Sequence, residues 1–241
     1  MKNFLKNSPM MFNFLRSLYK ITYRNIFKNK SFYFLFPSTK PISNIYGFDR
    51  GKPLDRHYIE KFLEDNKEDV HGVCLELLNN EYVKRYGGNL VTDSVILDID
   101  EGNKKATLIS DLRNLVEVKD NTFDCIILTQ VLQFIDNLDA AISECYRVLK
   151  PGGVLLATMP AIGRIDCASG VDGDYWRFTT ASAKYLFQKK FKQENLLVDS
   201  LGNAGAGIYF FAGFSEEDTP KKFFLVNDNN FPLVVTVKAI K

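Results

Sequence analysis

Residues 123–160 restrict the fold of this chain more than any other stretch of its sequence. They read FDCIILTQVLQFIDNLDAAISECYRVLKPGGVLLATMP. The stretch begins as an apolar strand, continues as an amphipathic helix, turns at Lys-Pro-Gly-Gly and ends in a second apolar strand. Because parallel strands are joined through helices in this way, the stretch predicts an α/β fold with helices covering a parallel sheet.

Strands and helices alternate on both sides of this stretch. Further strands are predicted over residues 72–78, 94–100, 106–112, 195–201 and 232–241. Helices are predicted over residues 55–65, 79–88, 138–149, 179–191 and 202–213. Asp136 or Asn137 is expected to cap the helix from 138, and Thr179 or Thr180 the helix that follows. Ligands of parallel sheets bind beyond the carboxyl ends of the strands, so we expect the functional site there.

Acidic residues follow three successive strands at this edge. Glu76 ends the first strand, Asp98 and Asp100 end the second, and Asp111 follows the third. In dinucleotide-binding folds, an acid ~20 residues beyond the first strand binds the ribose hydroxyls, because a carboxylate offers two acceptor oxygens. The alternative is that these acids serve only the turns, where Asp is common.

The bulk composition excludes several classes of protein. Four cysteines, Cys74, Cys125, Cys145 and Cys167, show no CxxC spacing, which argues against a zinc site or a disulfide framework and favours a reducing compartment. No metal site is predicted. The net charge is only +2, and the predicted catalytic half has no basic stripe with interleaved aromatics, so no nucleic-acid partner is expected.

The amino-terminal segment differs from the rest of the chain. Residues 1–48 contain no Asp or Glu, and residues 10–27 form a predicted amphipathic helix with Arg16, Lys20 and Arg24 on one face. Such a helix can lie on an anionic membrane, or it can pack on the domain with its cations solvated. We therefore divide the chain into a basic extension, residues 1–40, and a domain, residues 41–241. The expected location is cytoplasmic, with peripheral contact at the inner membrane face.

Residues 109–160, from ISDLRNLVEV to the end of the stretch described above, resemble class I S-adenosylmethionine (SAM)-dependent methyltransferases of the type 11 kind. Three flanking motifs resemble a subgroup found among bacterial surface-polysaccharide genes: DRGKPLDRHYIEKFL (49–63), YGGN (86–89) and GDYWRFT (173–179). The resemblance covers residues 41–241. It implies a Rossmann-like, three-layer α/β/α fold with a seven-stranded, mostly parallel sheet whose last strand is antiparallel.

The resemblance also implies SAM as cofactor and assigns roles to the strand-end residues. Glu76 would support the first loop and the methionine end of SAM, and Asp100 or Asp98 would bind the ribose. Asp111 with Leu112 would meet the adenine. Thr129 and Gln130 would line the methyl-transfer side.

The first loop departs from the family pattern. Class I enzymes carry Gly-x-Gly-x-Gly after the first acid, whereas those positions here are Leu78, Asn80 and Tyr82. A leucine forced into left-handed geometry costs about 1–2 kcal/mol, and its side chain would crowd the methionine moiety. Asn79 and Asn80 adopt that geometry more readily, so the turn itself could be retained.

The acceptor side is predicted to involve GDYWRFT and the helix before the sheet. Asp174, Tyr175 and Arg177 offer an acid, a phenol and a guanidinium beside Trp176, a set suited to a sugar with a phosphate or carboxylate. The alternative is that Trp176 packs, Arg177 pairs with Asp174 and Thr179 caps the next helix. His57 is the candidate base for a hydroxyl acceptor.

Two functional hypotheses follow. The first is a methyltransferase that acts on a glycan or nucleotide-sugar-linked acceptor in polysaccharide biosynthesis. The second is a non-catalytic, methyltransferase-like scaffold or membrane-surface protein with a degenerate SAM site. A nicotinamide-dependent dehydrogenase is disfavoured, because the phosphate-binding glycines are absent.

Overall fold

The computed structural model describes residues 39–166 and 172–241. The predicted helix over residues 10–27, its proposed membrane contact and Cys167 lie outside the described residues. Among the described helices, none has the length and hydrophobicity needed to cross a membrane.

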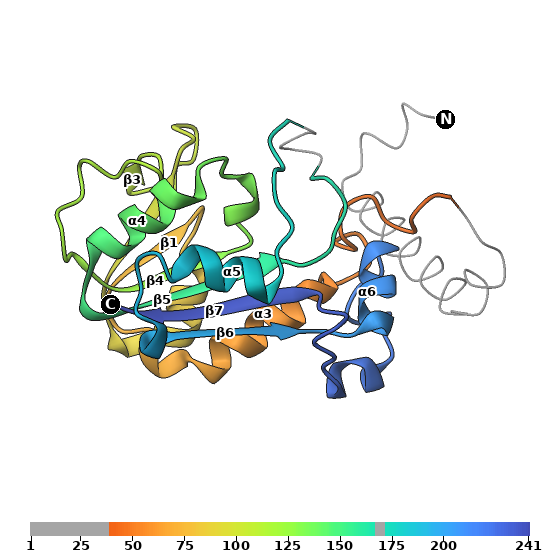
Figure 1. The fold of residues 1–241 in the computed structure, drawn as a ribbon. Coiled ribbons are helices and arrows are strands. Elements are labelled where there is room, and N and C mark those ends of the chain that lie inside the picture. The colour runs from red at the N-terminus through yellow and green to blue at the C-terminus, as the bar shows by residue number, and fades with distance from the viewer. Residues whose placement is uncertain (1–38, 167–171) are drawn as a thin grey trace, which may run out of the picture.

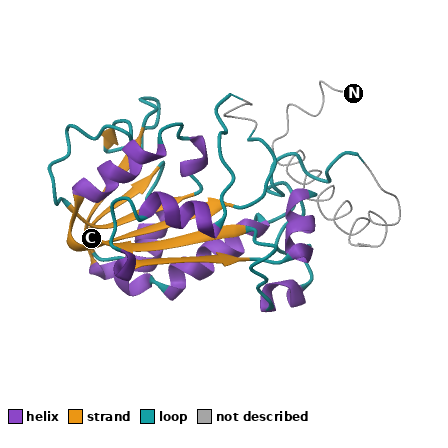
Figure 2. Cartoon of the chain, viewed as in Figure 1, coloured by secondary structure: helices purple, strands orange, loops and turns teal. Residues whose placement is uncertain are grey.

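Seven strands form one sheet in the order β3-β2-β1-β4-β5-β7-β6 (Figures 1 and 2). They are β1 (Gly72–Leu77), β2 (Val91–Asp98), β3 (Leu108–Ile109), β4 (Phe123–Thr129), β5 (Leu149–Pro160), β6 (Leu196–Leu201) and β7 (Val234–Ile240). The pairings among β1 to β5 are parallel, and β7 runs antiparallel to both β5 and β6. The predicted mostly parallel, seven-stranded sheet with an antiparallel last strand is confirmed.

Helices cover both faces of this sheet. The α-helices are α3 (Leu54–Asp65), α4 (Leu138–Val148), α5 (Thr180–Phe187) and α6 (Ala204–Phe211). Shorter 3-10 or π turns cover Lys67–Asp69, Val83–Gly87, Gly88–Leu90, Leu132–Phe134, Gln193–Asn195 and Lys221–Leu225. One buried cluster joins α4 and α5 to the sheet, and a second joins α3 and α6 to its other face. The predicted three-layer α/β/α fold is therefore confirmed.

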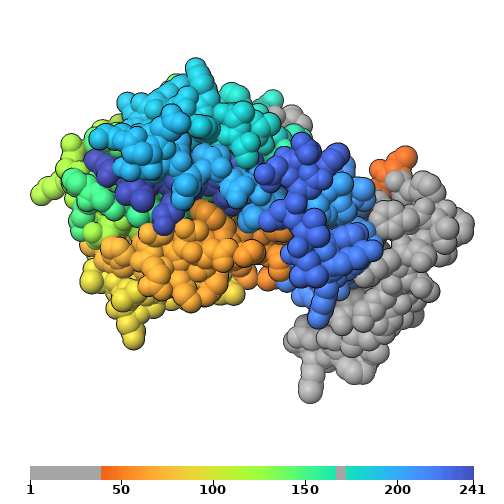
Figure 3. Space-filling model, turned by 60° about the horizontal axis from the view of Figure 1, so that its bottom comes forward, coloured from red at the N-terminus to blue at the C-terminus, as the bar shows by residue number. Residues whose placement is uncertain are grey.

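The apolar strands are explained by burial on both faces. In β4, Ile126 and Leu128 belong to the cluster beneath α4, whereas Cys125 and Ile127 belong to the cluster beneath α3. A strand of a covered parallel sheet must be apolar at every position rather than at alternate ones. Figure 3 shows the α3 segment (orange) directly against the carboxy-terminal segments (blue).

Helices α4 and α5 begin at predicted cap residues. Asn137 accepts a hydrogen bond from the Ala140 N–H (3.1 Å) at the start of α4. Thr179 and Ser182 form a reciprocal capping box at the start of α5. Of the two residues open at each cap, the structure selects Asn137 and Thr179.

The short helix predicted over residues 79–88 is present over residues 81–87, but it is irregular. Its main part, Val83–Gly87, is a π-helix, and a 3-10 turn follows it. A Cβ on Gly87 would lie 2.6 Å from the carbonyl oxygen of Val70, and Gly88 has a φ of +49°. The two glycines thus permit a close approach and a left-handed turn that end the helix early.

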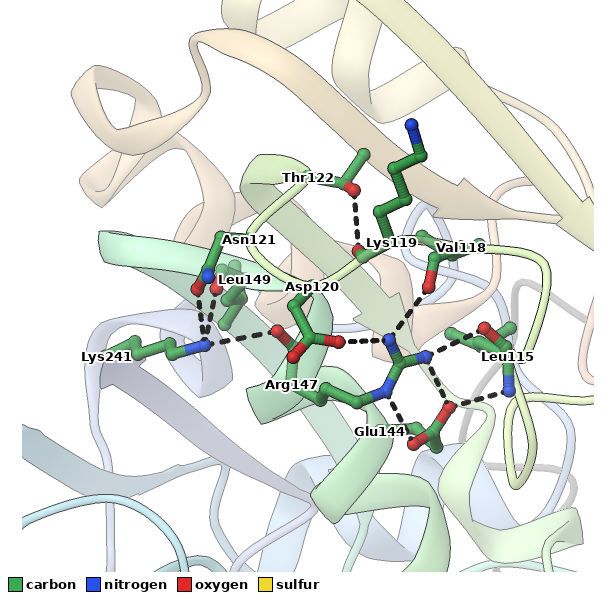
Figure 4. A network of polar contacts seen from close by, with 10 residues as sticks. All are labelled: Leu115, Val118, Lys119, Asp120, Asn121, Thr122, Glu144, Arg147, Leu149 and Lys241. Carbon is green, nitrogen blue, oxygen red and sulfur yellow. Dashed lines mark hydrogen bonds and ion pairs between the residues drawn. The ribbon is translucent and has the colours of Figure 1, made fainter.

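The arginine of the run Arg-Val-Leu-Lys-Pro-Gly-Gly, Arg147, has a structural role. Arg147 donates to Glu144 (2.9 and 2.8 Å) and Asp120 (2.7 Å), and to the carbonyl oxygens of Val118 (2.8 Å) and Leu115 (2.7 Å) (Figure 4). Glu144 also accepts the Leu115 N–H at 2.7 Å. The guanidinium therefore holds the loop before β4 against α4.

The Lys-Pro-Gly-Gly turn lies at the amino ends of β4 and β5. Lys150 Nζ lies 2.6 Å from Asp124 Oδ2, which also accepts the Val73 N–H at 2.8 Å. Gly152 has a φ of +80°, and a Cβ on Gly153 would lie 2.9 Å from the carbonyl oxygen of Lys150. This turn consequently fixes the sheet at the edge opposite to the predicted ligand site.

Replacing Arg147 with Ala is expected to lower the free energy of unfolding by about 1–3 kcal/mol, because two backbone carbonyls and Glu144 lose their charged partner. Arg113, a more exposed arginine, bridges only Asp111 and Asp136, so Arg113→Ala is expected to cost less than about 1 kcal/mol. Urea unfolding of both variants measures the difference. Equal costs would contradict a stabilising role for the Arg147 network.

Candidate functional site

Two connected hollows open at the carboxyl ends of β1, β4 and β5, beneath the start of α3. The β1 hollow, about 530 Å³, is lined by residues such as Glu76, Leu78, Asn79, Tyr82 and Arg85. The β5 hollow, about 440 Å³, is lined by residues such as Asp55, Gln130, Gln133, Asp174 and Arg177. Both hollows share the lining residues Phe48, Pro53, Arg56, Leu78 and Thr129. The site therefore has two lobes that meet at Leu78 and Arg56.

Glu76 organises the loop that follows β1. Its side chain is buried, and its two oxygens accept the backbone N–H groups of Tyr82 (3.3 Å) and Val83 (2.8 Å). Burial raises the pKa of Glu76 to about 7, although the two N–H donors act in the opposite direction. The carboxylate thus fixes the course of the chain around the β1 hollow.

Leu78 has the left-handed geometry that glycine normally supplies. Its φ is +68°, and the Asn79 N–H donates to the Leu77 carbonyl (2.8 Å), which makes residues 77–79 a strained γ-turn. The strained left-handed leucine considered from the sequence is therefore present, and neither Asn79 nor Asn80 has this geometry. The Leu78 side chain is 56% exposed and stands between the hollows, so the strain is not compensated by burial.

Asn80 is directed toward β2 rather than toward either hollow. Its Nδ2 donates to Ser94 Oγ at 3.0 Å. Asn79 does line the β1 hollow, and its Oδ1 accepts the Glu81 N–H at 2.9 Å.

The two acids at the end of β2 differ in their surroundings. Asp98 is buried and accepts the Asp100 N–H (3.0 Å) and Asn103 Nδ2 (2.6 Å), which also donates to the Leu78 carbonyl (2.8 Å). Asp100 is exposed and accepts the Gly102 N–H at 2.8 Å. Asp98 thus braces the loop, and Asp100 is the more exposed of the two acids. Neither acid is among the residues that line the two hollows.

Asp111 and Leu112 lie outside both hollows. Arg113 donates to both oxygens of Asp111, at 3.0 Å from Nε, and this pairing holds the pKa of Asp111 below its usual value. Leu112 is buried in the core beneath α4. An adenine amine would therefore have to share Asp111 with Arg113.

Thr129 and Gln130 lie where the sequence predicts, at the end of β4. Thr129 lines both hollows. Gln130 has a φ of +54°, and its N–H donates to the Thr158 carbonyl at 2.9 Å. Its carbonyl accepts from Gln133 Nε2 at 2.8 Å. This left-handed turn places Gln130 and Gln133 together on the wall of the β5 hollow.

Contacts within the GDYWRFT motif and to the next helix hold it in place. The ion pair between Arg177 and Asp174 and the cap by Thr179 agree with the alternative in which the motif has a structural role. Arg177 donates to both oxygens of Asp174 (2.6 and 2.9 Å), and the pair lowers the pKa of Asp174. Both residues line the β5 hollow. Tyr175 is 51% exposed and is not among the residues lining either hollow. Trp176 Nε1 donates to the Ile135 carbonyl at 2.8 Å.

His57 is separated from the other catalytic candidates. Its Nδ1 lies 3.0 Å from Glu216 Oε1, and its ring lies 4.1 Å from that of Phe224. His57 lines neither hollow. The structure therefore brings Asp174 and Arg177 together but leaves His57 and Tyr175 apart from them.

Asp55 and Arg56 were missed by the sequence analysis. Asp55 lines the β5 hollow, and burial raises the pKa of its carboxyl group. Arg56 lines both hollows and donates to the Tyr82 hydroxyl at 3.1 Å. The sequence could have indicated Asp55, because it precedes the inward-facing Tyr58 by one helical turn and so lies on the same face of the helix.

The donor set fits SAM in its general chemistry. The Arg56 guanidinium, which lines both hollows, suits the methionine carboxylate. Asp100 lies outside both hollows at the end of β2, and its two oxygens suit ribose hydroxyls. Both oxygens of Glu76 already accept hydrogen bonds from the backbone of the loop after β1. The main conflict is the Leu78 side chain, which occupies the junction between the hollows.

Comparisons with known proteins agree with this architecture. Residues 71–157 match the family model described as a methyltransferase domain. A curated ubiquinone/menaquinone biosynthesis C-methyltransferase from Hydrogenovibrio crunogenus is 36% identical over 77 residues, which cover 32% of this chain and only 28% of that protein.

Solved structures share the fold at low sequence identity. A SAM-dependent methyltransferase from Archaeoglobus fulgidus is 14% identical, with a TM-score of 0.51 over 77% of this chain and 94% of that chain. A provisionally assigned sarcosine dimethylglycine methyltransferase from Galdieria sulphuraria is 13% identical, with a TM-score of 0.52 over 80% of this chain and 88% of that chain. The chain therefore shares its fold with these SAM-dependent methyltransferases, and its residues 71–157 are similar to a methyltransferase domain.

Proposed function

We propose that this protein transfers a methyl group from SAM to an acceptor bound in the β5 hollow. The observation that carries the proposal is the pair of connected hollows at the carboxyl edge of a class I sheet, which meet at Arg56 and Thr129. One lobe provides a guanidinium for a carboxylate, and the other provides the polar wall of Gln130 and Gln133.

SAM, when bound, supplies a methyl group that is already activated toward nucleophiles. The residues of this chain would then need to align the acceptor and shield it from water. Arg56 and Asp100 would hold SAM, and Glu76 would keep the first loop in place. The Asp174–Arg177 pair would stiffen the far wall of the acceptor lobe.

For the acceptor we propose a glycan or a nucleotide-sugar-linked molecule, in line with the resemblance to the polysaccharide-gene subgroup. The β5 hollow combines aromatic rings, such as Tyr46 and Phe210, with polar groups, a mixture that suits a sugar. A small-molecule C-methyltransferase is the second candidate. It is favoured by the 77-residue similarity to the quinone-biosynthesis enzyme.

A non-catalytic scaffold remains the competing hypothesis, because Leu78 stands at the junction of the hollows. Calorimetric titration with SAM separates it from the enzyme. We expect saturable binding, weakened about tenfold in Arg56→Gln because a charged hydrogen bond is lost. Lys61→Gln, on the outer face of the same helix, is the control, since Lys61 lines neither hollow and pairs with Asp65 at the surface. The absence of any heat at millimolar SAM would reject the enzyme.

A further inference from the structure

Four side chains that line the β5 hollow each have one buried polar atom without a hydrogen-bond partner. The atoms are Asp55 Oδ1, Gln130 Nε2, Gln133 Oε1 and Arg177 Nε, and none has a partner among the described residues. Buried polar atoms in folded proteins nearly always have partners. Four such atoms on the wall of one hollow therefore indicate a site for a ligand that donates and accepts hydrogen bonds.

The charges around the hollow balance one another. The charged and titratable lining residues are Tyr46, Arg56, Arg164, Asp166, Asp174 and Arg177, besides Asp55 itself. Asp174 is paired with Arg177, and Asp166 accepts from the Tyr46 hydroxyl at 3.2 Å. Three guanidinium groups face three carboxylates, so the lobe has no excess positive charge for a phosphate. An uncharged, hydroxyl-bearing ligand fits the four atoms better.

Within the described residues, the Asp55 carboxylate has no ion pair and no hydrogen bond to another side chain, and its partners are the nearby charge of Arg56 and the backbone N–H groups of Asp55 and Arg56. It is the second residue of α3, one turn before the buried Tyr58. The preceding loop is held by the buried pair of Arg50 and Asp218, whose Nε–Oδ2 distance is 2.6 Å. The backbone that leads into α3 is therefore held in position, and burial raises the pKa of Asp55, as is common for a general base.

We propose that Asp55 accepts the proton of a hydroxyl group on an uncharged acceptor that Gln130 and Gln133 orient in the β5 hollow. This rests on the proposed methyltransferase function. The acceptor O–H bond breaks and its proton goes to Asp55 Oδ1, while the oxygen's electron pair forms a bond to the methyl carbon. The electron pair of the former methyl–sulfur bond remains on sulfur, so the product is a methyl ether and a neutral thioether. The proton later leaves to solvent.

The test compares Asp55→Asn with Asp139→Asn. Asp139 is likewise the second residue of its helix, α4, but its carboxylate pairs with Lys189 at the surface. The probes are labelled SAM and the methyl glycosides of glucose, mannose, rhamnose and fucose. We expect Asp55→Asn to lower kcat at least ~100-fold with little change in KM, and Asp55→Glu to recover part of the loss. Asp139→Asn should behave as wild type.

Each outcome has a distinct meaning. Binding of SAM by Asp55→Asn should equal that of wild type, and a failure of wild type to bind SAM would instead overturn the proposed function. Wild type that binds SAM but methylates none of the glycosides would overturn the acceptor class. Undiminished kcat in Asp55→Asn would overturn the role of Asp55.

Stability gives a readout that does not depend on turnover. Asp55→Asn removes a desolvated charge, so its Tm at pH 8 should rise by about 2–4 °C relative to wild type. A group whose folded pKa is raised destabilises the fold once it ionises, so this gain should shrink as the pH falls through the raised pKa and be gone below the ordinary pKa of an aspartate. A fall in Tm at pH 8 would indicate that Asp55 serves only the helix.

Discussion

Leu78→Gly is expected to tighten SAM binding about tenfold. Leu78 has a φ of +68° at the centre of a γ-turn, and its side chain stands where the two hollows meet. Glycine adopts this backbone geometry without the cost of about 1–2 kcal/mol that a left-handed leucine bears. Because the Leu78 side chain is more than half exposed, little hydrophobic burial is lost with it. The gain should appear in a calorimetric titration as a lower Kd.

Two further variants separate the backbone effect from the side-chain effect. Leu78→Ala keeps most of the left-handed strain but removes the bulk at the junction, whereas Leu78→Asn tolerates the geometry and keeps a side chain of similar length. If crowding limits binding, Ala and Gly should both tighten it. If backbone strain dominates, Gly and Asn should improve the free energy of unfolding while Ala should not. Unchanged binding in all three would mean that another element sets the affinity.

The layers of the fold could be predicted from the sequence, because strands and helices are indicated by short patterns that recur along the chain. The unbroken apolar run of residues 125–128 predicts a strand covered on both faces, and helix caps such as Asn137 and Thr179 can be predicted from a few neighbouring residues. The exact ends were less predictable. The segment 79–88 deviates because contacts from Val70, distant in sequence, decide where a side chain fits at Gly87.

The site was predicted less completely than the fold. Glu76, Leu78, Thr129 and Gln130 lie at strand ends, where topology alone brings them to one edge. The direction of a side chain, however, depends on its tertiary partners. His57 was selected for its residue type, yet it turns to Glu216, while Asp55 two residues earlier lines the hollow.

Two competing interpretations of GDYWRFT could not be separated by sequence. The i, i+3 spacing of Asp174 and Arg177 permits a pair, but it equally permits both groups to face a ligand. The structure shows that the pair forms and that it nevertheless lines the acceptor lobe. A structural role and a position in the site therefore coexist in this motif.

Glu76 is expected to make the stability of this protein depend on pH in a way that glutamine abolishes. Its folded pKa is about 7, and its ordinary value is 4.5. Between these values the unfolded chain has released the proton and the folded chain still holds it. The free energy of unfolding should thus fall as the pH rises from 4.5 to 7 and stay level above 7. The total change attributable to Glu76 is about 3 kcal/mol.

Other carboxyl groups titrate in the same range, so the quantity to measure is the difference between wild type and Glu76→Gln at each pH, from urea unfolding. That difference should decrease by about 3 kcal/mol from pH 4.5 to 7, because the amide cannot ionise. Glu144→Gln is the matched control. Arg147 lowers the pKa of Glu144, so the difference for that variant should change in the opposite direction, rising with pH through the acidic range. A flat difference for Glu76→Gln would mean that the N–H groups of Tyr82 and Val83 offset the cost of burying this carboxylate, and that the first loop is held by a charged rather than a protonated Glu76.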